Sequence, residues 1–277
     1  MLTIIKNTFR EALAKKIFIG YYIFYAIVVI LMLFAVNLDT VEGVISMTDV
    51  KQSVNLVEKG FLDISWALIV FFSLVSTASF IPSMLEKGTI DLLISKPVSR
   101  FTILLSKYLG AVLFMFLSMV FLLGSIWLIL SAKSGYWDFQ FLIAIPLITL
   151  AFAVMYSINV FIGLTTQSTI ISILVNFFLI FVLCPILSIR EGLIFTFVKN
   201  TGVQFVFNFL YWVFPKPGEI KDITSSILVG KKIDFWSTSI NMEAGDFTAS
   251  WMALITSLIF CIALFSYSTY YFSKKDY

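Results

Sequence analysis

The side chains that most often perform chemistry in proteins are scarce in this chain. It contains no histidine, which removes the Ser/His and Cys/His nucleophilic pairs and the commonest metal ligand. Cys184 and Cys261 are its two cysteines, and both lie in apolar runs, where a thiol behaves as a small hydrophobic group. The segment Gly230-Lys231-Lys232 lacks the upstream glycine and the hydroxyl residue of a phosphate-binding loop. We therefore expect neither an enzyme nor a bound metal or cofactor, and any ATP hydrolysis would have to occur on another chain.

Polar side chains inside the apolar runs are the next candidates for a site. Asp63 falls near the start of its predicted helix, so we expect an interfacial charge within reach of external water. Asn159 and Asn176 are the types that usually form hydrogen bonds between membrane helices. No run carries an arginine ladder or a chain of carboxylates, which are typical of proton-coupled or voltage-driven proteins. A secondary transporter or channel is therefore disfavoured but stays open as an alternative.

The elements that must position these residues lie in a membrane. The chain is 60% hydrophobic and 13% charged, with a mean hydropathy of +1.00. A soluble domain would have about 45–50% apolar and about 25% charged residues. The net charge of +3 is scattered and forms no basic patch with interleaved aromatic residues, so nucleic acid is not an expected partner.

Hydropathy predicts an all-α, polytopic membrane protein with six transmembrane helices, because a lone strand would leave backbone groups unpaired in lipid. The first run is too long for the apolar part of a signal peptide, so we interpret it as an uncleaved span. The six predicted spans are residues 17–36, 61–84, 108–130, 141–163, 170–188 and 251–271.

Lysine and arginine set the expected orientation. They are concentrated in residues 1–16, in the loop after the second span and in the C-terminal tail, whereas the alternate short loops carry acids beside few lysines. Short cytoplasmic loops are enriched in Lys and Arg, so both termini are expected to be cytoplasmic.

Residues 189–250 are predicted to form an external loop. Within it, residues 202–214 are too short to span and are typical of a re-entrant or interfacial helix, which the cluster beginning at Pro215 should end. The alternative is a seventh span over residues 193–214, which would bury Lys199 and place the basic tail outside.

Two cytoplasmic segments have helical patterns of their own. Residues 1–16 predict an amphipathic helix in the headgroup plane, either a plain anchor or one that also docks a partner. After the second span, Thr89 can cap a short helix that Pro97 ends, and Ser99 can cap the helix leading into the third span. The residues alone favour a solvated turn here and leave a docking element as the alternative.

These two segments and the tail resemble type-2 ABC permeases, in the branch that includes the nitrous-oxide-reductase maturation permease. Asn7-Thr8-Phe9-Arg10-Glu11-Ala12 with Lys15-Lys16-Ile17-Phe18 is similar to the family's elbow helix. Three segments after the second span are similar to the family's central loop: Glu86-Lys87-Gly88-Thr89-Ile90-Asp91-Leu92-Leu93, Ser95-Lys96-Pro97-Val98-Ser99-Arg100 and Leu105-Ser106-Lys107-Tyr108-Leu109-Gly110. Phe272-Ser273-Lys274-Lys275-Asp276-Tyr277 is similar to its basic tail, so the resemblance covers essentially the whole chain.

The resemblance implies one permease domain over residues 1–277, in the cytoplasmic (inner) membrane of a prokaryote. The subunit would pair with a second copy or a paralogue, and each subunit would bind a cytoplasmic ABC ATPase that holds the ATP. ATP hydrolysis would then drive export or transmit force across the membrane. The rivals are an ATPase-independent secondary transporter or channel and, less favoured, a scaffold or membrane enzyme.

The resemblance also assigns residues. It implies an elbow helix over residues 1–16 and a coupling helix within the loop 85–106. The implied elbow contacts are Phe9, Arg10 and Glu11. The implied ATPase contacts are Glu86, Gly88, Thr89, Asp91, Leu93, Pro97 and Arg100. The implied path-lining residues, on spans two and five, are Ser73, Ser76, Thr77 and Asn176.

Overall fold

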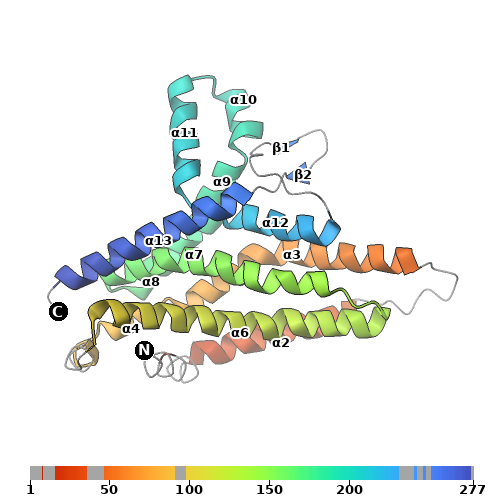
Figure 1. Ribbon diagram of the computed structural model, residues 1–277, viewed down its shortest axis with the longest axis horizontal. Helices are drawn as coiled ribbons and strands as arrows, with labels where there is room; N and C mark the ends of the chain where they lie inside the picture. The colour runs from red at the N-terminus through yellow and green to blue at the C-terminus, as the bar shows by residue number, and fades with distance from the viewer. Residues whose placement is uncertain are drawn as a thin grey trace.

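The computed structural model describes residues 8, 16–35, 47–90, 98–230, 240–241, 246–247 and 251–275, which are almost entirely helical. Long helices lie side by side along the longest axis of the molecule and alternate in direction (Figure 1). The main ones are α2 (Lys16–Ala35), α3 (Met47–Thr77), α6 (Arg100–Ser134), α7 (Ala144–Thr166) and α13 (Trp251–Lys274). In addition, β1 (Ile240–Asn241) and β2 (Asp246–Phe247) form a two-residue antiparallel pair.

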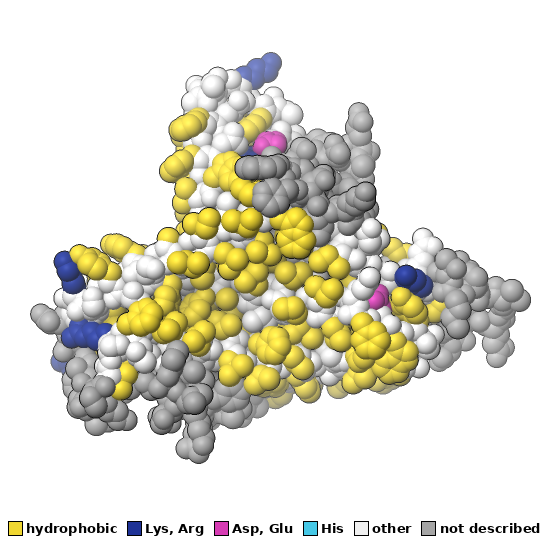
Figure 2. Space-filling model, viewed as in Figure 1, with side chains coloured by type: hydrophobic (Ala, Val, Ile, Leu, Met, Phe, Trp, Pro, Cys, Tyr) yellow, Lys and Arg dark blue, Asp and Glu magenta, His cyan; other side chains and the backbone are white. Residues whose placement is uncertain are grey.

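Among the residues that the structure describes, five helical segments are long and apolar enough to cross a membrane. They are Val50–Met84, Arg100–Ser134, Phe139–Thr166, Thr169–Ser188 and Trp251–Lys274, and the stretch Gly20–Phe34 is a shorter apolar helix by the same measure. Figure 2 shows apolar side chains spread along the length of the bundle, as expected for a surface that faces lipid. The protein is therefore a multi-pass membrane protein, and five of the predicted spans correspond to helices of sufficient length.

The second span begins earlier than predicted, because α3 starts at Met47. Val54, Glu58 and Leu62 lie four residues apart on one helical face and are buried, which explains why helix extends into a segment of mixed polarity. Asp63 consequently lies well inside α3, and its predicted position near the start of a helix is wrong. The helix breaks after Thr77 and resumes as α4 (Phe80–Met84), which contains Pro82.

The predicted cap of the third span is confirmed. The hydroxyl Oγ of Ser99 accepts a hydrogen bond from the backbone N–H of Thr102 at 3.2 Å, and α6 begins at the next residue. Gly135, at φ +69°, ends the helix in a left-handed conformation. With 35 residues, α6 is about 52 Å long, which exceeds the roughly 30 Å of a hydrocarbon core. The bundle is therefore taller than a bilayer core.

The centre of the bundle is α7, which packs against α3, α6, α8, α12 and α13. Phe152 and Tyr156 stack within it at 5.3 Å between ring centroids. Gly163 permits close contact with α4, since a Cβ placed there would lie 3.0 Å from Cβ of Ile81. The short helix η1 (Phe139–Ile143) leads into α7, and the side chain of Asp138 caps it.

The fifth span is one helical run with an irregular centre. It comprises α8 (Thr169–Phe178), the π-helical turn η2 (Leu179–Leu183) and α9 (Cys184–Ser188). Pro185 lacks a backbone N–H and so cannot donate to the carbonyl four residues earlier, which accounts for the widened turn just before it.

The segment after the fifth span is structured and not simply an external loop. It contains η3 (Arg190–Ile194), α10 (Phe195–Phe197), α11 (Thr201–Val213) and α12 (Pro217–Val229). The pair α10 and α11 projects sideways from the bundle, whereas α12 lies along it against α3 and α7 (Figure 1).

The predicted short helix at 202–214 corresponds to α11, and the alternative seventh span over 193–214 is wrong. The chain leaves helical geometry at Val198, and the side chain of Asn200 accepts a bond from the N–H of Gly202 at 2.9 Å to start a new helix. The cluster beginning at Pro215 does end α11, but Pro217 also starts α12, because proline suits a first helical position.

Candidate functional site

The predicted ATPase contacts are only partly within the described residues, and Asp91, Leu93 and Pro97 lie outside them. Glu86, Gly88 and Thr89 form an exposed turn after α4. The carbonyl of Glu86 accepts the N–H of Thr89 at 3.0 Å, and Gly88 takes φ +89°, a conformation that suits glycine. The next residue, Ile90, is buried and anchors the turn. The structure thus presents three of the seven predicted contacts on one exposed turn.

Arg100 is engaged by the protein's own last helix. Its Nη1 donates to the carbonyls of Phe272, Ser273 and Lys275 at 3.0, 3.3 and 2.7 Å. Nζ of Lys275 in turn donates to the carbonyl of Leu164 at 3.4 Å. Carbonyls at a helix C-terminus have no partners within the helix, so a cation there satisfies them and complements the helix dipole. These bonds connect the start of α6 to the ends of α7 and α13 at this end of the bundle.

The predicted elbow contacts Phe9, Arg10 and Glu11 lie outside the described residues. Within that arm the structure describes Thr8, which is fully buried. A Cβ placed at Gly110 of α6 would lie 3.1 Å from Cβ of Thr8, so the arm touches α6 at this position.

The predicted path-lining residues on α3 are buried within the subunit. The Ser73 hydroxyl lies 2.8 Å from the hydroxyl of Tyr21 on α2, and Thr77 donates to the carbonyl of Ser73 at 2.9 Å. Ser76 is also buried and donates to the carbonyl of Phe72, but it borders a cavity of about 230 Å³ between α2 and α3.

The two asparagines differ in their roles. Asn159 on α7 donates to the carbonyl of Leu74 on α3 at 3.3 Å, which confirms the predicted bond between helices. Asn176 on α8 donates within its own helix, to the carbonyl of Ser172 at 2.7 Å. Among the described residues, Oδ1 of each asparagine is buried without a hydrogen-bond partner. The structure does not bring Asn176 into contact with Ser73 or Thr77 through any hydrogen bond that it describes.

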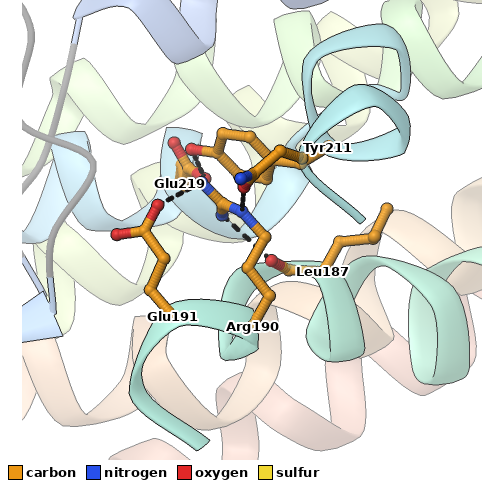
Figure 3. Close-up of polar contacts among 6 residues, drawn as sticks. Leu187, Arg190, Glu191, Tyr211 and Glu219 are labelled. Atoms are coloured by element: carbon orange, nitrogen blue, oxygen red, sulfur yellow. Dashed lines mark hydrogen bonds and ion pairs between the residues drawn. The ribbon is translucent and has the colours of Figure 1, made fainter. Parts of the chain in front are cut away.

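A buried cation, Arg190, organises the far end of the fifth span (Figure 3). Its Nε donates to Oδ1 of Asn208 at 2.8 Å, its Nη1 to the carbonyl of Leu187 at 3.1 Å, and its Nη2 to Glu191 at 2.8 Å. The guanidinium also lies 3.4 Å from the ring centroid of Tyr211. Each of the three guanidinium nitrogens therefore has a hydrogen-bond acceptor, which offsets the cost of burying the charge.

The same ring connects to a second group of charges. The Tyr211 hydroxyl donates to Oε1 of Glu219 at 2.5 Å, and Nζ of Lys216 lies 4.5 Å from the Tyr211 ring centroid. Burial raises the pKa of Glu219 above its ordinary range. Burial lowers the pKa of Lys216 to about 8. We call Arg190, Glu191, Asn208, Tyr211 and Glu219 the Arg190 cluster.

A cavity of about 250 Å³ lies between α3, α9 and α12. Trp66, Val70 and Pro185 contribute to its apolar walls, and charged residues border it. Asp63 pairs with Nζ of Lys221 at 3.2 Å, so it joins α3 to α12 as well as being partly exposed. The predicted access of Asp63 to solvent is confirmed, and its ion pair with Lys221 is an addition to that prediction.

Sequence reasoning missed Arg190, Lys216 and Glu58 as buried groups. All three lie in segments whose mixed polarity predicts loops, where charged residues are normally solvated. The available signal was the position of both cations beside the aromatic-rich α11, which supplies rings to cover them. Sequence alone does not show that these rings fold back onto the cations.

Comparison with known proteins agrees with the multi-pass helical architecture. The family described as ABC-2 family transporter protein matches residues 2–277. No curated protein matched the chain. Such permeases are normally non-catalytic membrane subunits of ABC transporters. A match over nearly the whole chain, on a bundle of membrane-length helices, means that this protein belongs to the ABC-2 family of transporter proteins.

Proposed function

We propose that this chain is the permease subunit of an ABC transporter, worked by an ATPase on a separate chain that holds the ATP. The observation that carries the proposal is the family match over residues 2–277. ATP binding and hydrolysis by the ATPase would move the helices and thereby export a substrate or transmit force across the membrane.

The proposed topology has six spans, with α2 as the sixth membrane-crossing helix. Its 20 residues correspond to about 30 Å, the thickness of a hydrocarbon core. Six helices that alternate in direction leave the start of α2 and the end of α13 on one side (Figure 1). We propose that this side faces the cytoplasm of a prokaryotic cell, and the basic residues near both termini support a cytoplasmic side. One permease domain, pairing with a second copy or a paralogue, completes the proposal.

The proposed ATPase contact is the exposed turn at Glu86, Gly88 and Thr89, continued by residues up to Pro97 within the coupling loop 85–106. The exposure of the turn and the buried anchor Ile90 support this role, because a docking element needs a free face and a fixed base. Residues 1–16 are proposed as the elbow helix. Arg100, the remaining predicted contact, stays part of the proposed ATPase contact and is also held from within the subunit by the end of α13.

Force transmission has a specific observation in its favour. The 35 residues of α6 exceed the length needed to cross the hydrocarbon, and α12 packs against α3 and α7 instead of forming a loose loop. Such a bundle can present a structured surface to an external partner, as we propose for a relative of the nitrous-oxide-reductase maturation branch. Among the described residues we find no comparable observation for an ATPase-independent transporter or channel.

Co-expression with a candidate cassette ATPase from the same organism, followed by purification in detergent, tests the proposal. Gly88→Asp and Leu93→Asp should lower both ATPase association and ATP hydrolysis. Gly135→Asp is the matched control, because Gly135 also has positive φ and open space around it but lies at the other end of α6. Failure of the ATPase to co-purify, or equal behaviour of the Gly88 and Gly135 variants, would contradict the proposal.

A labelling experiment tests the orientation separately. Cysteine introduced at Asp91 should react with an impermeant maleimide only from the cytoplasmic side. Reaction from the external side would overturn the topology.

A further inference from the structure

We propose that α13 is a strut that carries movement of the coupling loop to the far end of the bundle. Arg100 and Lys216 are the positioning residues that attach its two ends. The inference rests on the proposed function, since the movement it conveys originates at the ATPase.

The first attachment joins the coupling loop to the end of α13. Arg100 lies within the coupling loop 85–106 and is the first residue of α6. Its guanidinium donates to three carbonyls at or just after the C-terminus of α13. The same group lies 5.9 Å from the ring centroid of Phe272, which is itself buried. A shift of the loop therefore acts on α13 through several bonds at one guanidinium.

The helix between the attachments is suited to act as one body. It runs from Trp251 to Lys274 without glycine or proline, the residues at which helices usually kink. Its 24 residues span about 36 Å. By contrast, the fifth span contains a π-helical turn before Pro185, and the second span breaks between α3 and α4.

Contacts with α6 and α7 hold the middle of α13 in place. The Tyr108 hydroxyl on α6 donates to the carbonyl of Ala153 on α7 at 2.7 Å and lies 3.2 Å from Sγ of Cys261 on α13. The Tyr108 ring is also 4.9 Å from that of Phe265. These contacts keep α13 against its neighbours along its middle, so displacement at one end is conveyed to the other.

The second attachment lies near the start of α13. The backbone N–H of Lys216 donates to Oγ of Ser257 at 3.1 Å, and its Nζ donates to Oγ1 of Thr256 at 2.9 Å. Pro215 and Pro217 flank Lys216 and fix the φ angles on either side of it. Because Lys216 joins α11 to α12, movement of α13 reaches both helices and the Arg190 cluster.

Hydrogen–deuterium exchange of the permease–ATPase complex, with and without ATP and vanadate, tests the strut. In the wild type, exchange in residues 201–213 should differ between the two states by about fivefold or more. In the permease–ATPase complexes that form, Arg100→Gln should abolish that difference. Lys274→Gln, which removes an exposed cation from the same end of α13, should leave the difference intact.

A second pair of variants guards against simple misfolding. Arg100→Lys keeps the charge but loses the guanidinium geometry, and should reduce the response without altering exchange of α7. Lys216→Met should abolish the response in residues 201–213 but keep it in residues 268–275.

The outcomes separate the two proposals. If the wild-type complex forms and hydrolyses ATP, a wild-type response in Arg100→Gln overturns the strut, as does the absence of any nucleotide response at residues 201–213. If the wild-type chain does not bind the ATPase, the proposed function itself fails.

Discussion

Replacing Arg190 by methionine tests the view that one buried cation holds the projecting pair α10 and α11 in place. Methionine keeps a long apolar stem but removes the charge and all the donors. Asn208, Glu191 and the carbonyl of Leu187 would each lose a partner, and the Tyr211 ring would lose its cation.

The expected cost follows from the burial of the guanidinium, which is 2% exposed. Removing one partner of a buried ion pair costs about 3–5 kcal/mol. Glu191 is 34% exposed and can recover water, so we take the lower end, about 3 kcal/mol. At roughly 1.4 kcal/mol for each factor of ten, amides of α11 that exchange through local opening should exchange about 100-fold faster.

Hydrogen–deuterium exchange of residues 201–213 in the purified permease measures this effect. Lys199→Met is the matched control, because it removes an exposed cation from the same segment. Its exchange should stay close to that of the wild type. Equal exchange rates in the two variants would show that the Arg190 cluster does not hold α11, and the reasoning would be refuted.

Three further predictions follow from packing, capping and titration. Gly163→Val should lower the melting temperature by about 2–10 °C, because its Cβ meets Ile81, whereas Gly124→Val meets nothing within 4 Å and should change it little. Ser99→Ala should cost about 1 kcal/mol and speed amide exchange at the start of α6, while Ser99→Asp should not. The pKa of Lys216 is lowered from 10.5 to about 8, so the unfolded chain binds more protons between those values. Stability should therefore rise with pH between about 8 and 10.5. Lys216→Met should flatten the rise of melting temperature with pH. An unchanged slope of melting temperature against pH in this variant would contradict the burial argument.

The sequence predicted the spans well where the apolar pattern was uninterrupted. The fourth, fifth and sixth predicted spans match helices closely, because about 20 apolar residues leave helix as the only way to satisfy the backbone in lipid. Helical segments outside the apolar runs were harder to predict. The first part of α3 and all of α12 owe their form to packing on each other, and their mixed polarity resembles that of loops.

The candidate site was predictable in part. The cap at Ser99 was predictable because it is a local interaction, with the backbone N–H three residues later, and the structure confirms it. The bond from Arg100 to the carbonyl of Phe272 was not predictable, because nothing in the sequence places these two distant residues side by side. The burial of Arg190 was not predictable for the same reason, because nothing in the sequence places η3 beside Asn208 and Tyr211 of α11.

The central claim is that an ATPase works on the end of the bundle that carries the Glu86–Thr89 turn. Placing a photo-crosslinking amino acid at Thr89, and separately at the exposed Trp137 beyond the other end of α6, tests it directly in cells that also contain the ATPase. We predict a crosslink to the ATPase from position 89 and none from position 137. A crosslink from position 137, or none from position 89, would contradict the account.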